Sequence, residues 1–329
     1  MIVSAAIVTY VLLLVTCLSA YALDLAITGW AAAVRELILY LFVPAPFLLL
    51  TAVCFQTRRS MLLLAVPTAA FLYLYGGQFV PRAAVLAAGP TFRMLSFNVA
   101  AGRGYGQAEP VVGLILAEKP DLVALQEVRD DALETIGAVL RDGYPYQGRS
   151  DDGVILSRAP ILEMYPFRPD TGGHEGLVAE VVINDRIITL FNAHPFLPTA
   201  YPRWRREGLR LARQYNTNDR NDAVTELLEQ LEAVGGPRLL VGDFNMSPTS
   251  FAHRLITTDL RDSYEEVGWG FGHTVPANFE PTAPNISMPL FRVDYIFHSP
   301  EIAALRTWVG PYTHSNHLPV IADLQIVGP

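Results

Sequence analysis

Lysine, cysteine and charge are all scarce in this 329-residue chain. Only 17% of its residues are charged, where soluble domains average about a quarter. Lys119 is the single lysine and the net charge is −8, which disfavours a dedicated nucleic-acid-binding protein, because phosphate-backbone affinity depends mainly on Lys and Arg. The only cysteines, Cys17 and Cys54, lie in apolar runs, so a disulfide-stabilised small domain is excluded and an oxidising compartment is permitted.

The few charges are distributed unevenly along the chain. Residues 1–82 hold six: Asp24, Arg35, Glu36, Arg58, Arg59 and Arg82. The remaining 247 residues hold 20 basic and 30 acidic side chains, a net charge of −10. The composition therefore indicates an apolar N-terminal part followed by an acidic domain with an ordinary content of charge.

Three long apolar runs lie within residues 1–82, at about 2–23, 37–55 and 61–80. Each is close to the roughly 20 residues that an α-helix needs to cross a bilayer. Pro44, Pro46 and Pro67 are expected to kink the second and third runs, as membrane helices tolerate. The sequence predicts a membrane anchor with three transmembrane helices, and the bilayer is its expected partner.

The orientation of the anchor follows from paired positive charges between two runs. Arg58 and Arg59 form the only such pair, so the positive-inside rule places their link in the cytoplasm and the following domain outside. Arg82 and Arg93 argue for the opposite side. We expect a multi-pass plasma-membrane protein with an extracytoplasmic domain. Residues 20–22 resemble a signal-peptidase site, but no positively charged region precedes the run, so an uncleaved anchor is favoured.

The sequence predicts a tether at residues 83–91 and one α/β domain at residues 92–329. Short β-branched runs predict strands at 92–99, 122–125, 153–156, 177–183, 187–192, 238–241, 293–297 and 320–326. Helix-like segments lie near 107–118, 130–141, 203–213 and 219–234. Several strands follow one another without an intervening helix, which favours mixed sheets over a Rossmann or TIM-barrel design.

Polar side chains recur where the predicted strands end. They are Asn98, Glu127, His194, Asp243, Asn245, Asp294 and His317. Any one of them could be an ordinary strand-end or turn residue, but acids, amides and imidazoles gathered together suit phosphoester hydrolysis. Carboxylate oxygens hold a hard divalent cation, a positioned base activates water, and imidazoles stabilise phosphoryl charge.

Six ordered segments carry a resemblance to a known family. They are Phe97-Asn98-Val99, Leu125-Gln126-Glu127-Val128, Asn192-Ala193-His194, Gly242-Asp243-Phe244-Asn245, Arg292-Val293-Asp294-Tyr295-Ile296-Phe297 and Ser315-Asn316-His317. In type, order and spacing they resemble the motifs of the endonuclease/exonuclease/phosphatase superfamily, which includes DNase I-like nucleases, sphingomyelinases and inositol-polyphosphate phosphatases. The resemblance implies a four-layer α/β/β/α sandwich of two mixed sheets.

The resemblance also implies catalytic roles for five residues. His194 would donate to the scissile phosphate, and Asp243 would orient or deprotonate the attacking water. Asn245 would help to hold the nucleophile and the phosphate. His317 would face the phosphate, with Asp294 as its carboxylate partner.

The metal ligands that the resemblance implies are Glu127, with Asn98 beside it, for Mg²⁺ or alternatively Mn²⁺. Asn316 departs from the pattern, because the family usually has Ser-Asp-His where this chain has Ser315-Asn316-His317. An amide still offers an oxygen ligand, but the site loses one negative charge. We therefore expect weaker metal affinity more than a loss of activity.

An arginine-rich segment follows His194. In a helix, Arg203, Arg206 and Arg210 would share one face, where they could bind an anionic lipid headgroup or a diphosphate. An ordinary solvated helix face paired with glutamates explains the pattern equally well. The apolar residues after His194 could contact a lipid tail or form an ordinary packed loop. His174 lies among turn residues, so it is interpreted as a loop histidine.

The sequence leaves three functions open. The first is a membrane-anchored, metal-dependent phosphohydrolase that acts on a lipid-linked phosphate or diphosphate, similar to membrane-anchored bacterial members such as the teicoplanin-resistance membrane proteins. The second is a membrane-tethered nuclease, which the acidic domain disfavours. The third is a non-catalytic module that binds a phosphate ligand. No protein partner can be inferred.

Overall fold

The computed structural model describes residues 2–23, 29–82, 89–100, 108–171, 173–198, 215–277 and 289–327. They form two compact units, one built around the N-terminal helices and one around two β-sheets.

Two helices of the first unit are long and apolar enough to cross a membrane. One is α1 (Ile2–Ala22) and the other covers Arg58–Phe79, which contains α4 (Arg58–Leu63), α5 (Ala65–Tyr75) and η2 (Gly76–Phe79). Their lengths and composition agree with the first and third predicted spans.

The second predicted span, residues 37–55, is covered by two consecutive helical elements. It lies in η1 (Ile38–Phe42) and α3 (Pro44–Cys54), and α2 (Gly29–Glu36) precedes it with a bend of 75°. Pro44 and Pro46 stand in the first turn of α3, where a missing N–H costs least, so the helix restarts there. The described residues thus contain two candidate spans, or three if the bent pair is one span.

The second unit contains two six-stranded mixed sheets. The first has the order β11 (Ile302–Val309), β12 (Val320–Ile326), β1 (Thr91–Asn98), β2 (Leu122–Gln126), β4 (Gly153–Ser157) and β3 (Tyr146–Arg149). The second has the order β5 (Ile161–Phe167), β6 (Gly176–Ile183), β7 (Arg186–Ala193), β8 (Arg238–Asp243), β10 (Asp294–His298) and β9 (Arg261–Asp262).

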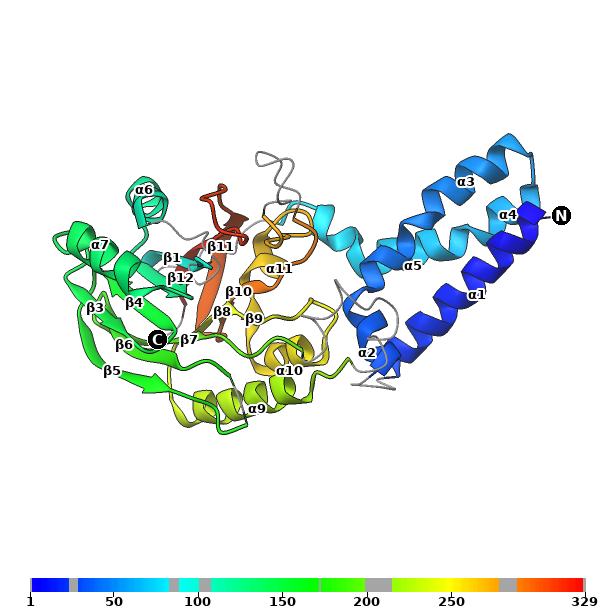
Figure 1. Ribbon diagram of the computed structural model, residues 1–329. Helices are drawn as coiled ribbons and strands as arrows, with labels where there is room; N and C mark the ends of the chain where they lie inside the picture. The colour runs from blue at the N-terminus through cyan, green and yellow to red at the C-terminus, as the bar shows by residue number, and fades with distance from the viewer. Residues whose placement is uncertain are drawn as a thin grey trace. The chain divides into compact units, whose positions relative to one another are not determined.

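Three apolar cores separate four layers. Figure 1 shows the helices on the two outer sides of the paired sheets. Alternate residues of the strands form the core between the sheets, with Met94 on the first sheet and Leu190 on the second. Helices α6 (Ala108–Glu118) and α7 (Asp130–Leu140) cover the outer face of the first sheet. Helices α9 (Asn218–Ala233) and α10 (Phe251–Asp259) cover the second, and α11 (Ser263–Val267) follows β9. The predicted α/β/β/α sandwich is confirmed.

Candidate active site

The first sheet brings Asn98 and Glu127 together. Asn98 is the last residue of β1 and Glu127 directly follows β2. These strands are parallel neighbours, with Asn98 opposite Gln126, so their carboxyl ends lie at the same edge of the sheet. The backbone of Glu127 turns out of the strand with a positive φ of 53°.

The second sheet brings His194, Asp243 and Asp294 together by the same geometry. Strands β7 and β8 are parallel, so His194, which follows β7, lies beside Asp243 at the end of β8. Strand β10 runs antiparallel to β8 and begins at Asp294, directly opposite Asp243. In the first sheet, β12 is antiparallel to β1, so His317, three residues before β12, lies near the end of β1.

Asn98 connects the two sheets at this edge. Its Nδ2 donates to Oδ2 of Asp243 at 3.0 Å and to Oε1 of Glu127 at 3.1 Å. Its Oδ1 accepts from the backbone N–H of Ala100 at 2.8 Å. In this arrangement Asn98 bridges two carboxylates, and its role as a metal ligand stays a prediction.

Asp243 lies between two imidazoles. Its Oδ2 is 3.6 Å from Nε2 of His194 and 3.7 Å from Nε2 of His317. Each histidine uses its other nitrogen to contact a carboxylate: Nδ1 of His194 is 2.8 Å from Asp152, and Nδ1 of His317 is 2.9 Å from Asp294. Two His–carboxylate pairs therefore flank one aspartate, an arrangement that fixes both rings and supports their positive charge.

The carboxylates raise the pKa of both histidines. Burial alone would lower the pKa of His194, but the hydrogen bond with Asp152 and the charge of Asp243 raise it overall. Burial also opposes the charge on His317, yet Asp294 and Asp243 raise its pKa to about 9. Burial would raise the pKa of Asp152, but its hydrogen bond with His194 lowers it. Positive imidazoles beside a phosphate group stabilise the charge that develops in hydrolysis.

Asn245 lies next to Asp243 in a loop with a positive φ of 50°. Its backbone N–H donates to Oδ1 of Asp243 at 2.9 Å, and its side-chain Nδ2 donates to the carbonyl of Pro195 at 3.0 Å. A buried arginine, Arg220, donates to the Asn245 carbonyl at 2.6 Å. These contacts connect Asn245, in the loop after β8, to Pro195 in the loop after β7 and to Arg220 of the helix at 218–233.

Two side chains of the site, Glu127 and Asn316, offer oxygen ligands that suit a hard divalent cation. The Glu127 side chain is 22% exposed and offers carboxylate oxygens. Oδ1 of Asn316 is buried and has no hydrogen-bond partner among the described residues. Asn316 is held near Asn98, because Oγ of the preceding Ser315 donates to the Asn98 carbonyl at 2.8 Å. A buried oxygen without a donor is unfavourable unless a cation or water satisfies it, so these residues fit a metal with oxygen ligands.

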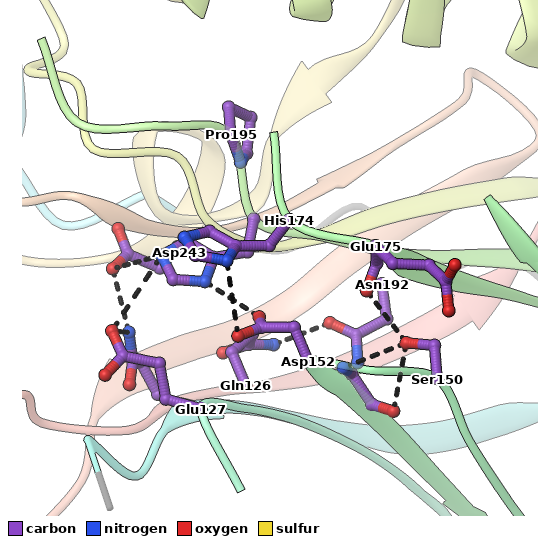
Figure 2. Close-up of polar contacts among 12 residues, drawn as sticks. Gln126, Glu127, Ser150, Asp152, His174, Glu175, Asn192, Pro195 and Asp243 are labelled. Atoms are coloured by element: carbon purple, nitrogen blue, oxygen red, sulfur yellow. Dashed lines mark hydrogen bonds and ion pairs between the residues drawn. The ribbon is translucent and has the colours of Figure 1, made fainter. Parts of the chain in front are cut away.

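Two residues of the site were not predicted from the sequence. Asp152, just before β4, is the partner of His194, and His174 contacts the same carboxylate with Nδ1 3.8 Å from its Oδ1 (Figure 2). The prediction that His174 is an ordinary loop residue misses this contact. Most of the predicted site residues follow a strand, whereas Asp152 precedes one, and nothing in the sequence shows that this end of the strand reaches His194.

The structure brings together seven of the eight predicted catalytic and metal-ligating residues through direct contacts: Asn98, Glu127, His194, Asp243, Asn245, Asp294 and His317. Asn316 follows Ser315 in the same loop as His317. The predicted substrate-binding residues Arg203, Arg206 and Arg210, and most of the tether, lie outside the described residues.

The sequence matches the Endonuclease/Exonuclease/phosphatase family over residues 95–317, which cover every motif described above. The chain belongs to this family. As a member of it, the protein is a metal-dependent phosphoric ester hydrolase. The family uses divalent metals, and the site contains carboxylate and histidine clusters that could hold one, such as Asp243, Asp294 and His317.

Solved structures share the fold of this family member. An endonuclease/exonuclease/phosphatase family protein from Bacteroides thetaiotaomicron matches with a TM-score of 0.57 and 18% identity, covering 74% of this chain and 100% of that chain. A mannosyl-6-phosphatase from the same organism has a TM-score of 0.54 and 20% identity, covering 71% and 99%. D. rerio TDP2 complexed with a single-strand DNA product has a TM-score of 0.56 and 17% identity, covering 71% and 99%. No curated protein matches the chain.

Proposed function

We propose that this hydrolase is a membrane-anchored phosphohydrolase that acts on a lipid-linked phosphate or diphosphate at the outer face of the plasma membrane. The observation that carries the proposal is the presence, in one chain, of a family hydrolase domain and helices long enough to span a membrane. Only eleven residues separate Phe79 from Thr91, so an extended connection reaches at most about 40 Å. Such a tether raises the effective concentration of the site near lipid substrates.

The proposed reaction assigns a role to each residue of the site. Asp243 accepts a proton from the attacking water, and Asn245 orients it. His194 and His317, held by Asp152 and Asp294, donate to the phosphoryl oxygens. Asn98 keeps the carboxylates of Glu127 and Asp243 in place by donating to both.

Mg²⁺ is the proposed cation, and Mn²⁺ is the alternative. Glu127 and Asn316 would hold it, because carboxylate and amide oxygens are the ligands that Mg²⁺ prefers. When bound, the cation neutralises phosphoryl charge and makes the phosphorus easier to attack.

A nuclease activity is the second candidate, since one similar structure, D. rerio TDP2, is bound to single-strand DNA. The net charge of −10 over residues 83–329 opposes a large polyanionic substrate. The arginine-rich segment at 203–210 is proposed to contact the lipid headgroup or the diphosphate instead.

The full-length protein in lipid nanodiscs tests the proposal. With Mg²⁺ it should release phosphate or headgroup from lipid phosphoesters, and EDTA or Glu127→Ala should abolish the release. Glu134→Ala removes an exposed carboxylate of α7 and should leave turnover unchanged. Cleavage of plasmid DNA without any lipid turnover would replace the proposal with the nuclease, and tight phosphate binding without turnover would indicate a binding module.

A further inference from the structure

His174 occupies a specific place beside the proposed catalytic residues. Its ring stacks on the His194 ring, with centroids 4.4 Å apart and planes inclined by 20°. Its backbone N–H donates to the His194 carbonyl at 3.1 Å. The edge of the Phe196 ring packs against it at a centroid distance of 5.0 Å. These contacts fix the ring of a residue that lies in an irregular loop.

The two stacked imidazoles face the same way. His194 directs Nδ1 to one oxygen of Asp152 at 2.8 Å, and His174 directs Nδ1 to the other oxygen at 3.8 Å. The second nitrogen of each ring is therefore turned away from Asp152, and that of His194 approaches Asp243.

The two rings differ in access to solvent. The His194 side chain is 5% exposed, whereas that of His174 is 43% exposed. The stack thus contains an inner imidazole beside Asp243 and an outer imidazole at the mouth of the site. Burial and the neighbouring His194 lower the pKa of His174, whereas a negatively charged group beside the ring favours its protonated form.

We propose that His174 binds a second phosphoryl group next to the scissile one, so that the preferred substrates of this site are diphosphates. The two rings have centroids 4.4 Å apart, and each directs Nδ1 to Asp152, so the imidazolium forms present two Nε2–H donors to neighbouring acceptors. A diphosphate offers a separate phosphoryl group to each ring, whereas a monophosphate offers only one. This inference rests on the proposed hydrolytic function and narrows its substrate class.

In the step that His174 assists, the water oxygen forms a bond to the scissile phosphorus, and the bond from that phosphorus to the bridging oxygen breaks. The electron pair stays on the bridging oxygen of the departing phosphate, and the water proton passes to Asp243. His174 stabilises the negative charge of the departing phosphate, so it contributes to diphosphate turnover only.

Two matched substrate pairs test the inference on the full-length protein: farnesyl phosphate with farnesyl diphosphate, and phenyl phosphate with phenyl diphosphate. The variant His174→Phe keeps an aromatic ring on His194 but removes both nitrogens. We expect it to lower kcat/KM for the diphosphates at least tenfold, mainly through KM, and to change the monophosphates less than threefold. His174→Gln, which retains a side-chain N–H, should recover part of the preference.

Equal losses on both members of a pair would show that His174 only positions His194 and would overturn the inference, as would unchanged kinetics. Turnover of the phenyl pair without the farnesyl pair would refute the lipid substrate while still reporting on His174. Calorimetry without metal supplies a readout independent of turnover. Methylenediphosphonate should bind the wild type more tightly than methylphosphonate does, and His174→Phe should remove that difference; if the difference persists, the inference is wrong.

Discussion

Asn98 and Asp243 are 145 residues apart in the chain, yet Nδ2 of the first donates to Oδ2 of the second at 3.0 Å. Asn98 ends a strand of one sheet and Asp243 ends a strand of the other. Both side chains are buried, so the hydrogen bond ties the two sheets together at the edge where the site lies.

Replacement of Asn98 by alanine should therefore impair the site more than the fold. The change leaves Glu127 and Asp243 without their shared donor, and two carboxylates without a bridge repel each other. We expect turnover to fall about 100-fold, as is typical when a supporting hydrogen bond at a metal site is lost. Steady-state kinetics and a thermal melt check this, and a variant with full activity would show that the bridge is dispensable.

Two neighbouring aspartates offer a matched comparison for the His194 partner. Asp152 contacts His194 at 2.8 Å, whereas the exposed Asp151 pairs with Arg168 at 2.8 Å. Asp152→Asn should lower kcat about 100-fold, because the ring loses the carboxylate that orients it and supports its charge. Asp151→Asn should leave kcat unchanged. Equal effects of the two substitutions would contradict the assigned pair.

The fold was largely predictable because the buried strands consist of uninterrupted β-branched runs. Strands β1, β6 and β12 lie within one residue of their expected ends. Strand β5 was missed, since six of its seven residues are not buried, their burial does not alternate, and Pro166 interrupts the strand. Strand β11 was missed because its sequence, with Arg306 and Thr307 near its middle, lacks a long apolar run.

The site was predictable in its motif residues but not in its partners. Asp243 and His317 stand in short motifs with fixed spacing, so the resemblance identified them. Asp152 and His174 belong to loops on β4 and β6, and only the sheet pairing brings these loops to His194. A carboxylate that supports a histidine can come from any neighbouring strand end, so sequence spacing does not select it.

The Asp294–His317 pair leads to a pH prediction. Asp294 and Asp243 raise the pKa of His317 to about 9, so its imidazolium form persists as the pH rises to that value and is lost above it. If this positive ring assists turnover, kcat/KM falls as the pH passes through about 9. Asp294→Asn removes the carboxylate that most strongly raises the pKa, so the alkaline limb should move to lower pH.

A pH–rate profile from pH 5 to 10 measures that shift. Asp259→Asn, which changes an exposed carboxylate at the end of α10, is the control and should keep the wild-type profile. An alkaline limb that stays in place in Asp294→Asn would show that the pair does not set the pH dependence.

Asn316 offers a test of the metal position. Its buried Oδ1 has no hydrogen-bond partner in the described part of the chain, as expected of an oxygen that faces a cation. Asn316→Asp adds one negative charge there, so the Mg²⁺ concentration that gives half-maximal activity should fall about tenfold. Titration of activity with Mg²⁺ measures this, and an unchanged midpoint would place Asn316 away from the metal.

The side of the membrane on which the hydrolase domain lies can be measured, because its described residues contain no cysteine to interfere with labelling. Cys17 and Cys54 are replaced by serine, and one cysteine is introduced at the exposed Glu134 of α7 or at Thr57 in the positively charged link. The positive-inside rule predicts that an impermeant maleimide labels position 134 in intact cells and position 57 only after permeabilisation. The reverse pattern would place the domain in the cytoplasm. Arg82 and Arg93 would then be the positive charges that the positive-inside rule keeps on that side.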